Sequence, residues 1–191
     1  MKKFKRRGEA ITTHFSGYEV ALLSSLITQL VDMVSEGEPQ QFEPADPAED
    51  LFVQLSRDLH LDPDEPEISD DPVLQRLFPS AYPHDAAASS DFRRFTERDL
   101  KTKKITEAQF VLARLAETDE GAHPVRIAPD EVDPWLRTLT SLRLAVATRL
   151  GISDAESAEE LAELPDDDPR AFMLSVYDWL AFAQETLIAA L

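Results

Sequence analysis

Few residues of this 191-residue chain stand at spacings that could perform chemistry. The four histidines are scattered, with no His-x-x-x-His pair and no cysteine partner: His14, His60, His84 and His123. The run of three aspartates at 166–168 lacks the alternating spacing, the glycine and the glutamate of an EF-hand calcium loop. A helix N-cap at Asp168, before Pro169, explains that run better. The sequence therefore predicts no metal centre.

Catalytic motifs are also missing from the sequence. It has no cysteine, no Gly-x-Ser-x-Gly nucleophile elbow, and only five glycines, none of which cluster into a phosphate-binding loop. Acidic residues are so frequent that the proximity of two carboxylates carries almost no information about acid–base catalysis. We therefore expect a protein that is not an enzyme and needs no cofactor, and we assign no catalytic residue.

The most distinctive feature is a cluster of positive charge in a chain whose net charge is −18. Residues 93–104 carry six basic residues against two acidic ones. The six are Arg93, Arg94, Arg98, Lys101, Lys103 and Lys104. In a helix, Arg94, Arg98 and Lys101 follow four-then-three spacing and form one cationic ridge. We assign the six residues as a candidate interaction surface.

Three kinds of partner are compatible with this basic surface. Two acidic stretches of the same chain could pair with it, residues 36–72 with thirteen Asp or Glu and residues 153–168 with eight. The second is a protein partner. The third is nucleic acid, although the net charge of −18 opposes its approach. A secondary basic patch comprises Lys2, Lys3, Lys5, Arg6 and Arg7.

Composition places the chain among globular proteins, with 43% hydrophobic and 29% charged residues. Its length suits a single domain, 1–191, with its own core. The basic residues 1–7 are followed by polar residues rather than an apolar signal segment, and no run of about 18 apolar residues exists. The absence of cysteine fits an intracellular protein. We therefore expect a cytoplasmic protein without membrane contact.

The elements that would position these residues are mainly helical. Residues 1–16 are predicted to form a basic β-hairpin, and Val125–Ile127 is a third short strand that could join it. Apolar spacing and capping signals predict helices over residues 16–36, 47–59, 73–78, 85–101, 105–117, 133–150, 153–163 and 169–191. Acidic, Pro-rich loops are expected at 36–47 and 60–71. The expected fold is a bundle of about six to eight helices with a small N-terminal antiparallel sheet.

The sequence also predicts the burial, capping or pairing of individual side chains in these helices. Ala88, Phe92 and Phe95 share one helix face and are expected to enter the core. Ser16 with Glu19 and Ser153 with Glu156 are each expected to form a capping box, and Gly151 is expected to end the helix that precedes it. One or two of Arg137, Arg143 and Arg149 are expected to pair with carboxylates of neighbouring helices. The last helix is apolar on several sides, so it is either central to the core or part of a homodimer interface. Residues expected to be buried or paired for structural reasons are Arg76, Tyr82, Trp135, Arg143, Arg149, Tyr177 and Trp179.

Two blocks of the chain resemble a known actinobacterial family. The matching residues are Asp71-Pro72, Arg76-Leu77-Phe78-Pro79, Tyr82, Asp85, Phe92-Arg93-Arg94, Leu100, Trp135-Leu136, Leu142-Arg143-Leu144, Thr148-Arg149-Leu150-Gly151 and Tyr177-Asp178-Trp179-Leu180. The chain is similar in these residues to the AosR-like family of unknown-function domains, named for an oxidative-stress transcriptional regulator.

The resemblance implies a cytoplasmic, non-catalytic protein with a role in stress-linked transcription. Members are often encoded beside the adaptor of the Clp protease, so a role in Clp-type proteolysis is an alternative, and direct DNA binding through the basic helix is another. Redox sensing would require a cysteine pair, and this chain has none. Thiol-based sensing is therefore not implied here.

Overall fold

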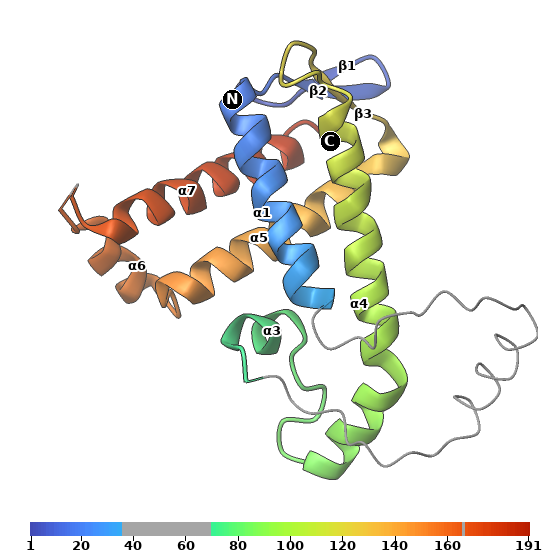
Figure 1. The fold of residues 1–191 in the computed structure, drawn as a ribbon, viewed down its shortest axis with the longest axis vertical. Helices are drawn as coiled ribbons and strands as arrows, with labels where there is room; N and C mark the ends of the chain where they lie inside the picture. The colour runs from blue at the N-terminus through green and yellow to red at the C-terminus, as the bar shows by residue number, and fades with distance from the viewer. Residues whose placement is uncertain (36–69, 166) are drawn as a thin grey trace, which may run out of the picture.

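Six α-helices and a three-stranded β-sheet make up the described part of the chain, residues 1–35, 70–165 and 167–191, in the computed structural model (Figure 1). The expected mainly helical fold with a small N-terminal antiparallel sheet is confirmed. The predicted helix 47–59 lies outside the described residues, as do the predicted loops at 36–47 and 60–69.

The sheet lies at one end of the molecule (Figure 1). Strands β1 (Lys5–Arg7) and β2 (Ala10–Thr13) form the predicted hairpin around Gly8, whose φ of +65° suits a tight turn. Strand β3 (Val125–Ile127) pairs antiparallel with β2, with Ile11 opposite Ile127. Both of these isoleucines are buried, so the inner face of the sheet belongs to the core.

Helix α1 (Gly17–Ser35) follows the sheet, and its predicted N-terminal capping box is present. The backbone N–H of Ser16 donates to Glu19 Oε2 at 2.8 Å, and the backbone N–H of Glu19 donates to Ser16 Oγ at 3.4 Å. The N-terminal ammonium of Met1 also pairs with Glu19. The buried stripe of α1 repeats every three or four residues and comprises Val20, Leu23, Ile27, Leu30 and Val34.

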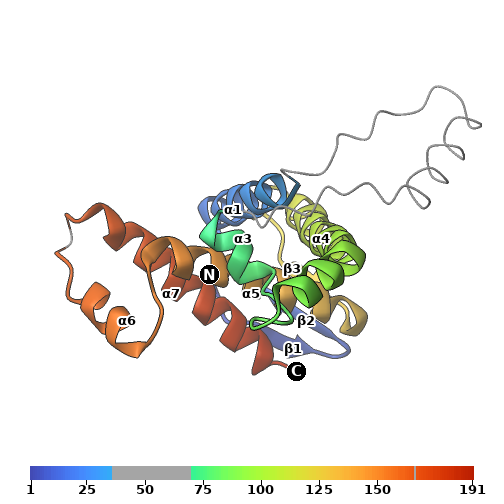
Figure 2. The same ribbon diagram turned by 90° about the horizontal axis from the view of Figure 1, so that it is seen from below.

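Helix α4 (Ala86–Ala116) differs from the prediction because it is one continuous helix of 31 residues, where two were expected. No glycine or proline interrupts residues 102–104, so the backbone has no reason to break there. Its second half buries Ala108, Val111 and Leu115. Its first half extends beyond α1, with α3 (Pro72–Leu77) beside it (Figures 1 and 2).

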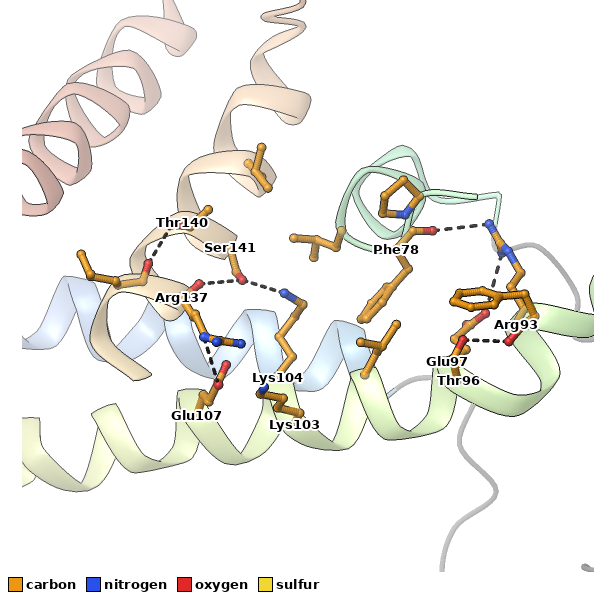
Figure 3. Close-up of a pocket in the computed structure, with 16 residues that line it drawn as sticks. Phe78, Arg93, Thr96, Glu97, Lys103, Lys104, Glu107, Arg137, Thr140 and Ser141 are labelled. Atoms are coloured by element: carbon orange, nitrogen blue, oxygen red, sulfur yellow. Dashed lines mark hydrogen bonds and ion pairs between the residues drawn. The ribbon is translucent and has the colours of Figure 1, made fainter. Parts of the chain in front are cut away.

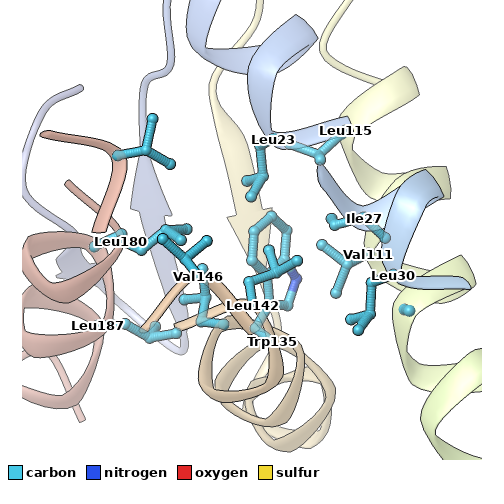
Figure 4. Packing of buried hydrophobic residues seen from close by; sticks show 14 of the residues in the cluster. Leu23, Ile27, Leu30, Val111, Leu115, Trp135, Leu142, Val146, Leu180 and Leu187 are labelled. Atoms are coloured by element: carbon cyan, nitrogen blue, oxygen red, sulfur yellow. The ribbon is translucent and has the colours of Figure 1, made fainter. Parts of the chain in front are cut away.

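Helices α5 (Val132–Leu150) and α7 (Pro169–Ile188) pack against each other and complete the core. A 3₁₀ turn, Pro129–Glu131, leads into α5, and the short α6 (Ala155–Ala162) joins the two helices. Side chains from α1, α4, α5 and α7 converge around Trp135 (Figure 4). This indole is fully buried and meets the ring of Phe4 edge-on, at 6.5 Å between centroids.

The caps of the later helices test two local predictions. Asp168 caps α7 as predicted, since its Oδ1 accepts from the backbone N–H of Arg170 at 2.8 Å. The predicted Ser153–Glu156 capping box is wrong by one residue. Asp154 is the N-cap of α6, and it exchanges hydrogen bonds with Ser157. A carboxylate accepts more strongly than a hydroxyl, which favours Asp154 over its neighbour.

Asp71 connects α3 to α5, so replacing it tests how much these two contacts stabilise the fold. Its Oδ1 accepts from the backbone N–H of Val73 at 2.7 Å, and its Oδ2 pairs with Arg149 of α5 at 2.6 Å. We expect Asp71→Ala to lower the free energy of unfolding by about 0.5–2 kcal/mol. Asp71→Asn, which keeps a capping oxygen and removes the charge, should cost less. Equal losses for the two variants in urea unfolding would contradict a capping role.

The pKa of the Asp71 carboxyl sets the pH range of this effect. Burial raises that pKa, but the hydrogen bonds from Val73 and Arg149 outweigh burial, so the net pKa lies below its ordinary value of 3.8. The stabilisation is therefore present above pH 3.8 and lost as the pH falls through the lower pKa of the folded state.

Candidate functional site

The first half of α4 exposes aromatic side chains that the sequence predicted to be buried. Phe92 is 41% exposed and Phe95 is 74% exposed, which corrects the expectation that both enter the core. The reason is that the turn after α3 covers Phe92 only in part, through Tyr82, and leaves Phe95 uncovered. Tyr82 from that turn is 49% exposed and contacts Phe92 edge-on at 5.9 Å.

The six basic residues predicted as one surface divide into three groups. Arg93 and Lys101 both approach Glu97, at 3.8 Å and 3.0 Å, so their charges are held against α4 itself. Arg93 also donates to the carbonyl oxygen of Phe78 at 3.4 Å. The side chains of Arg93, Lys101 and Glu97 are only 13%, 17% and 19% exposed, so these two cations present little charge to a partner. Lys101 is therefore not part of the exposed cationic ridge that the sequence predicted.

Lys104 points in a different direction from the rest. Its ammonium donates to Ser141 Oγ on α5 at 3.0 Å and lies 5.7 Å from the ring centre of Phe78. Burial lowers the pKa of Lys104, the charge of Glu107 opposes this, and the charge of Arg137 lowers it further. Lys104 therefore belongs to the interior of a pocket rather than to the outer surface.

Arg94 and Arg98 remain exposed on the side of α4 that faces away from the bundle. The guanidinium of Arg94 lies 5.7 Å from the ring centre of Phe95, in a cation–π contact. Neither arginine forms an ion pair with a described residue. We call Arg94, Phe95 and Arg98 the α4 outer face. Lys103 is also exposed, but it lies at the rim of the pocket.

The secondary basic patch lies far from the α4 outer face. Its residues, Lys2, Lys3, Lys5, Arg6 and Arg7, are all exposed. They belong to the sheet end of the molecule, whereas the first half of α4 lies at the opposite end (Figure 1). Arg6 donates to the carbonyl oxygen of Leu191 at 2.5 Å. The structure therefore does not bring the two basic patches into one continuous surface.

The residues predicted as structural occupy varied environments. Trp135 is fully buried, and Trp179 meets the ring of Phe15 edge-on at 6.1 Å. Arg149 pairs with Asp71, although half of its side chain is exposed. Arg76 lies exposed on the outer side of α3, and Tyr82, in the turn after α3, is exposed and contacts only the ring of Phe92 among the described aromatic residues.

Arg143 was expected to pair with a carboxylate, and the structure gives it other partners. It donates to Gln184 Oε1 at 2.8 Å and contacts Tyr177, with its guanidinium 5.2 Å from the ring centre. Both partners belong to α7, so Arg143 ties α5 to α7. Elsewhere on α7, the side chains of Phe172 and Ile188 are exposed. A homodimer through α7 stays a prediction, which light scattering would test.

A pocket of about 420 Å³ adjoins the α4 outer face, and sequence reasoning missed it (Figure 3). It lies between the end of α3, the first half of α4 and the middle of α5. Its polar lining includes Lys104, Glu107, Arg137 and Ser141. One signal was present in the sequence: Lys104 stands four residues before Ala108, in register with the buried stripe of α4.

Metal and membrane sites were also sought within residues 1–35, 70–165 and 167–191. No group of three or more His, Asp or Glu side chains there could hold a metal ion. No helix in those ranges has the length and apolar character needed to cross a bilayer.

Fold and site together define a mainly α-helical protein with a three-stranded sheet and a basic, aromatic helix face beside a pocket. The chain belongs to the family described as Domain of unknown function (DUF2017), whose model matches residues 1–191. This membership confirms the family predicted from the sequence. No solved structure was found to match the chain.

Curated mycobacterial relatives carry a functional name. The chain is 25% identical over 197 residues to the oxidative stress regulator AosR of Mycobacterium tuberculosis (strain ATCC 25618 / H37Rv), covering 97% of this chain and 84% of that protein. The identity and coverage are the same for the AosR of Mycobacterium bovis. The AosR relative of Mycobacterium leprae is 26% identical over 208 residues, covering 100% of this chain and 88% of that protein. These names support a regulatory role at low identity.

Proposed function

We propose that this protein is a non-catalytic regulator that binds another protein through the α4 outer face, in the stress-linked control of transcription. The observation that carries the proposal is Phe95, which is 74% exposed and lies between Arg94 and Arg98. Aromatic and arginine side chains are the residues most enriched at the energetic centres of protein interfaces. The names of the mycobacterial relatives support the regulatory part of the proposal.

The chemistry of the α4 outer face indicates the kind of surface that would bind it. The benzyl side chain of Phe95 requires an apolar pocket, and the two guanidiniums require carboxylates at its rim. A helix that projects with one exposed face is also suited to lying in a groove. The expected partner segment is therefore an apolar depression bordered by Asp or Glu.

Charge reversal on α4 tests this surface. We expect the double variant Arg94→Glu/Arg98→Glu to reduce partner recovery from the native cytoplasm by about 30-fold or more, which corresponds to the loss of one interface hot spot. Phe95→Ala should have a similar effect without changing the charge. The partner is identified by mass spectrometry with the unmodified protein, and its affinity for each purified variant is then measured by titration.

The secondary basic patch provides a matched control. Lys2→Glu/Lys3→Glu changes the net charge by the same amount at the opposite end of the molecule, so partner affinity should stay unchanged. Equal recovery by the α4 double variant and the unmodified protein would refute the role of the α4 outer face. Equal losses in both double variants would indicate a general charge effect instead.

Direct DNA binding is the second candidate, and the exposed guanidiniums of Arg94 and Arg98 are the observation in its favour. The separation of the two basic patches and the net charge of −18 limit the number of phosphate contacts. A gel shift at about 50 mM salt, where phosphate contacts are strongest, distinguishes the two functions. A complex that disappears in the α4 double variant would favour DNA.

A further inference from the structure

The pocket beside α4 has the size and construction of a small-molecule site. Its volume of about 420 Å³ lies within the range of about 300–1,000 Å³ typical of such sites. Three separate elements enclose it: the end of α3, the first half of α4 and the middle of α5. A ligand bound there would contact all three.

One part of the pocket wall is apolar. The side chains that form it come from all three elements and are Leu77, Phe78, Phe92, Leu100, Leu136 and Leu144. Phe92 and Leu100 are 41% and 48% exposed, so their outer surfaces are still in contact with water. Covering them with the apolar part of a ligand would be favourable, because it removes apolar surface from water.

The polar part of the wall centres on the ammonium of Lys104 (Figure 3). Ser141 Oγ is its one hydrogen-bond partner among the described residues, and that hydroxyl donates onward to the carbonyl oxygen of Arg137. Within the same residues, no carboxylate forms an ion pair with Lys104. Two of its three N–H groups therefore lack an acceptor among the described residues. Glu107 acts on this cation only through its charge, without an ion pair, and a partly buried cation with unused N–H groups favours the approach of an anion.

The other charges of the wall do not supply that anion. Glu97 is engaged by Arg93 and Lys101, and Glu107 lies 3.6 Å from the guanidinium of Arg137. The wall contains four basic residues, Arg93, Lys103, Lys104 and Arg137, against two acidic ones. It is a region of excess positive charge within a chain whose net charge is −18.

We propose that this pocket binds an amphipathic organic carboxylate, with the carboxylate between Lys104 and Arg137 and the apolar body against Phe78, Leu136 and Leu144. The Lys104 ammonium forms no ion pair with a described residue, and a single negative charge would supply one. A phosphate ester fits less well, because its second charge would meet only Lys103, which is exposed at the rim, and Arg137, which is already paired with Glu107. A neutral ligand would leave the N–H groups of Lys104 without an acceptor.

Titration with octanoate tests the proposal on the purified full-length chain. Octanoate should bind saturably by calorimetry, and the amide NMR signals of Leu77, Phe78 and residues 136–144 should shift. Octanol and octylamine have the same apolar chain and should bind more weakly, because they lack the anion. Octyl phosphate tests the charge preference and should also bind more weakly than octanoate.

Substitutions then locate the carboxylate. Lys104→Met keeps the length of the side chain and removes the charge, so octanoate affinity should fall by about tenfold or more. Lys103→Met makes the same change at the rim and should leave the affinity nearly unchanged. Arg137→Met is a second test at a half-exposed position, where folding is not at risk, and it should also weaken binding.

Three results would overturn the proposal: no saturable binding of octanoate, binding that Lys104→Met leaves unchanged, or equal binding of octanol. Because these measurements use the purified protein alone, they are independent of the partner experiment on the α4 outer face.

Discussion

Replacing Trp135 with alanine is expected to lower the free energy of unfolding by about 3–5 kcal/mol, the usual cost of deleting a buried aromatic side chain. Trp135 has no exposed surface and lies where side chains of α1, α4, α5 and α7 meet (Figure 4). Removal of the indole would also end its edge-on contact with Phe4, next to the sheet. The cavity would therefore lie at the centre of the core, where surrounding helices cannot easily close it.

Urea unfolding followed by circular dichroism measures this loss, and Trp135→Phe is the matched control. Phenylalanine keeps an aromatic ring and removes the indole N–H, which is buried and has no hydrogen-bond partner among the described residues. Removing that unsatisfied N–H offsets part of the lost packing, so Trp135→Phe should cost clearly less than the alanine variant. A loss of about 1 kcal/mol or less for Trp135→Ala would contradict the central position of this residue.

Gly121→Ala is expected to be the most damaging exchange of a glycine, lowering the free energy of unfolding by about 2–5 kcal/mol. Two causes add. The φ of Gly121 is +87°, a conformation that costs an L-residue about 1–2 kcal/mol. A Cβ atom there would also lie 2.7 Å from the carbonyl oxygen of Phe15 and 2.9 Å from the backbone nitrogen of Gly17. These contacts are with backbone, so no side chain can move aside.

Gly151→Ala and Gly8→Ala are the matched controls for this prediction. Their φ angles are +78° and +65°, but a Cβ atom at either position would have no neighbour within 4 Å. Each should therefore cost only the conformational part, about 1–2 kcal/mol. If Gly121→Ala proved no worse than Gly151→Ala, the close approach of the α4–β3 turn to the start of α1 would be refuted.

The predictions that the structure confirmed depend on residues close together in the sequence. The Ser16–Glu19 capping box, the Asp168 cap and the left-handed Gly151 after α5 all arise from side chains within a few residues of a helix end. The buried stripe of α1 likewise follows from its own apolar spacing. Such signals need no knowledge of the neighbouring elements.

Several of the predictions that were wrong concern the first half of α4. Spacing placed Phe92 and Phe95 on a helix face that could be buried, yet both are exposed because the turn after α3 covers Phe92 only in part and leaves Phe95 uncovered. The same spacing joined Arg94, Arg98 and Lys101 in one ridge, but Glu97 holds Lys101. A helix in isolation offers several apolar faces, and only the packing of its neighbours selects one.

By itself, the sequence determined the mainly helical fold, most helix ends, the family and the basic segment, because these depend on local backbone chemistry and on residue identity. The tertiary structure alone decided which cations of that segment remain exposed. It turned Lys104 toward Ser141, which lies 37 positions away along the chain, and it enclosed a pocket between α3, α4 and α5. Contacts at that separation depend on how whole helices pack, and no local pattern records that packing.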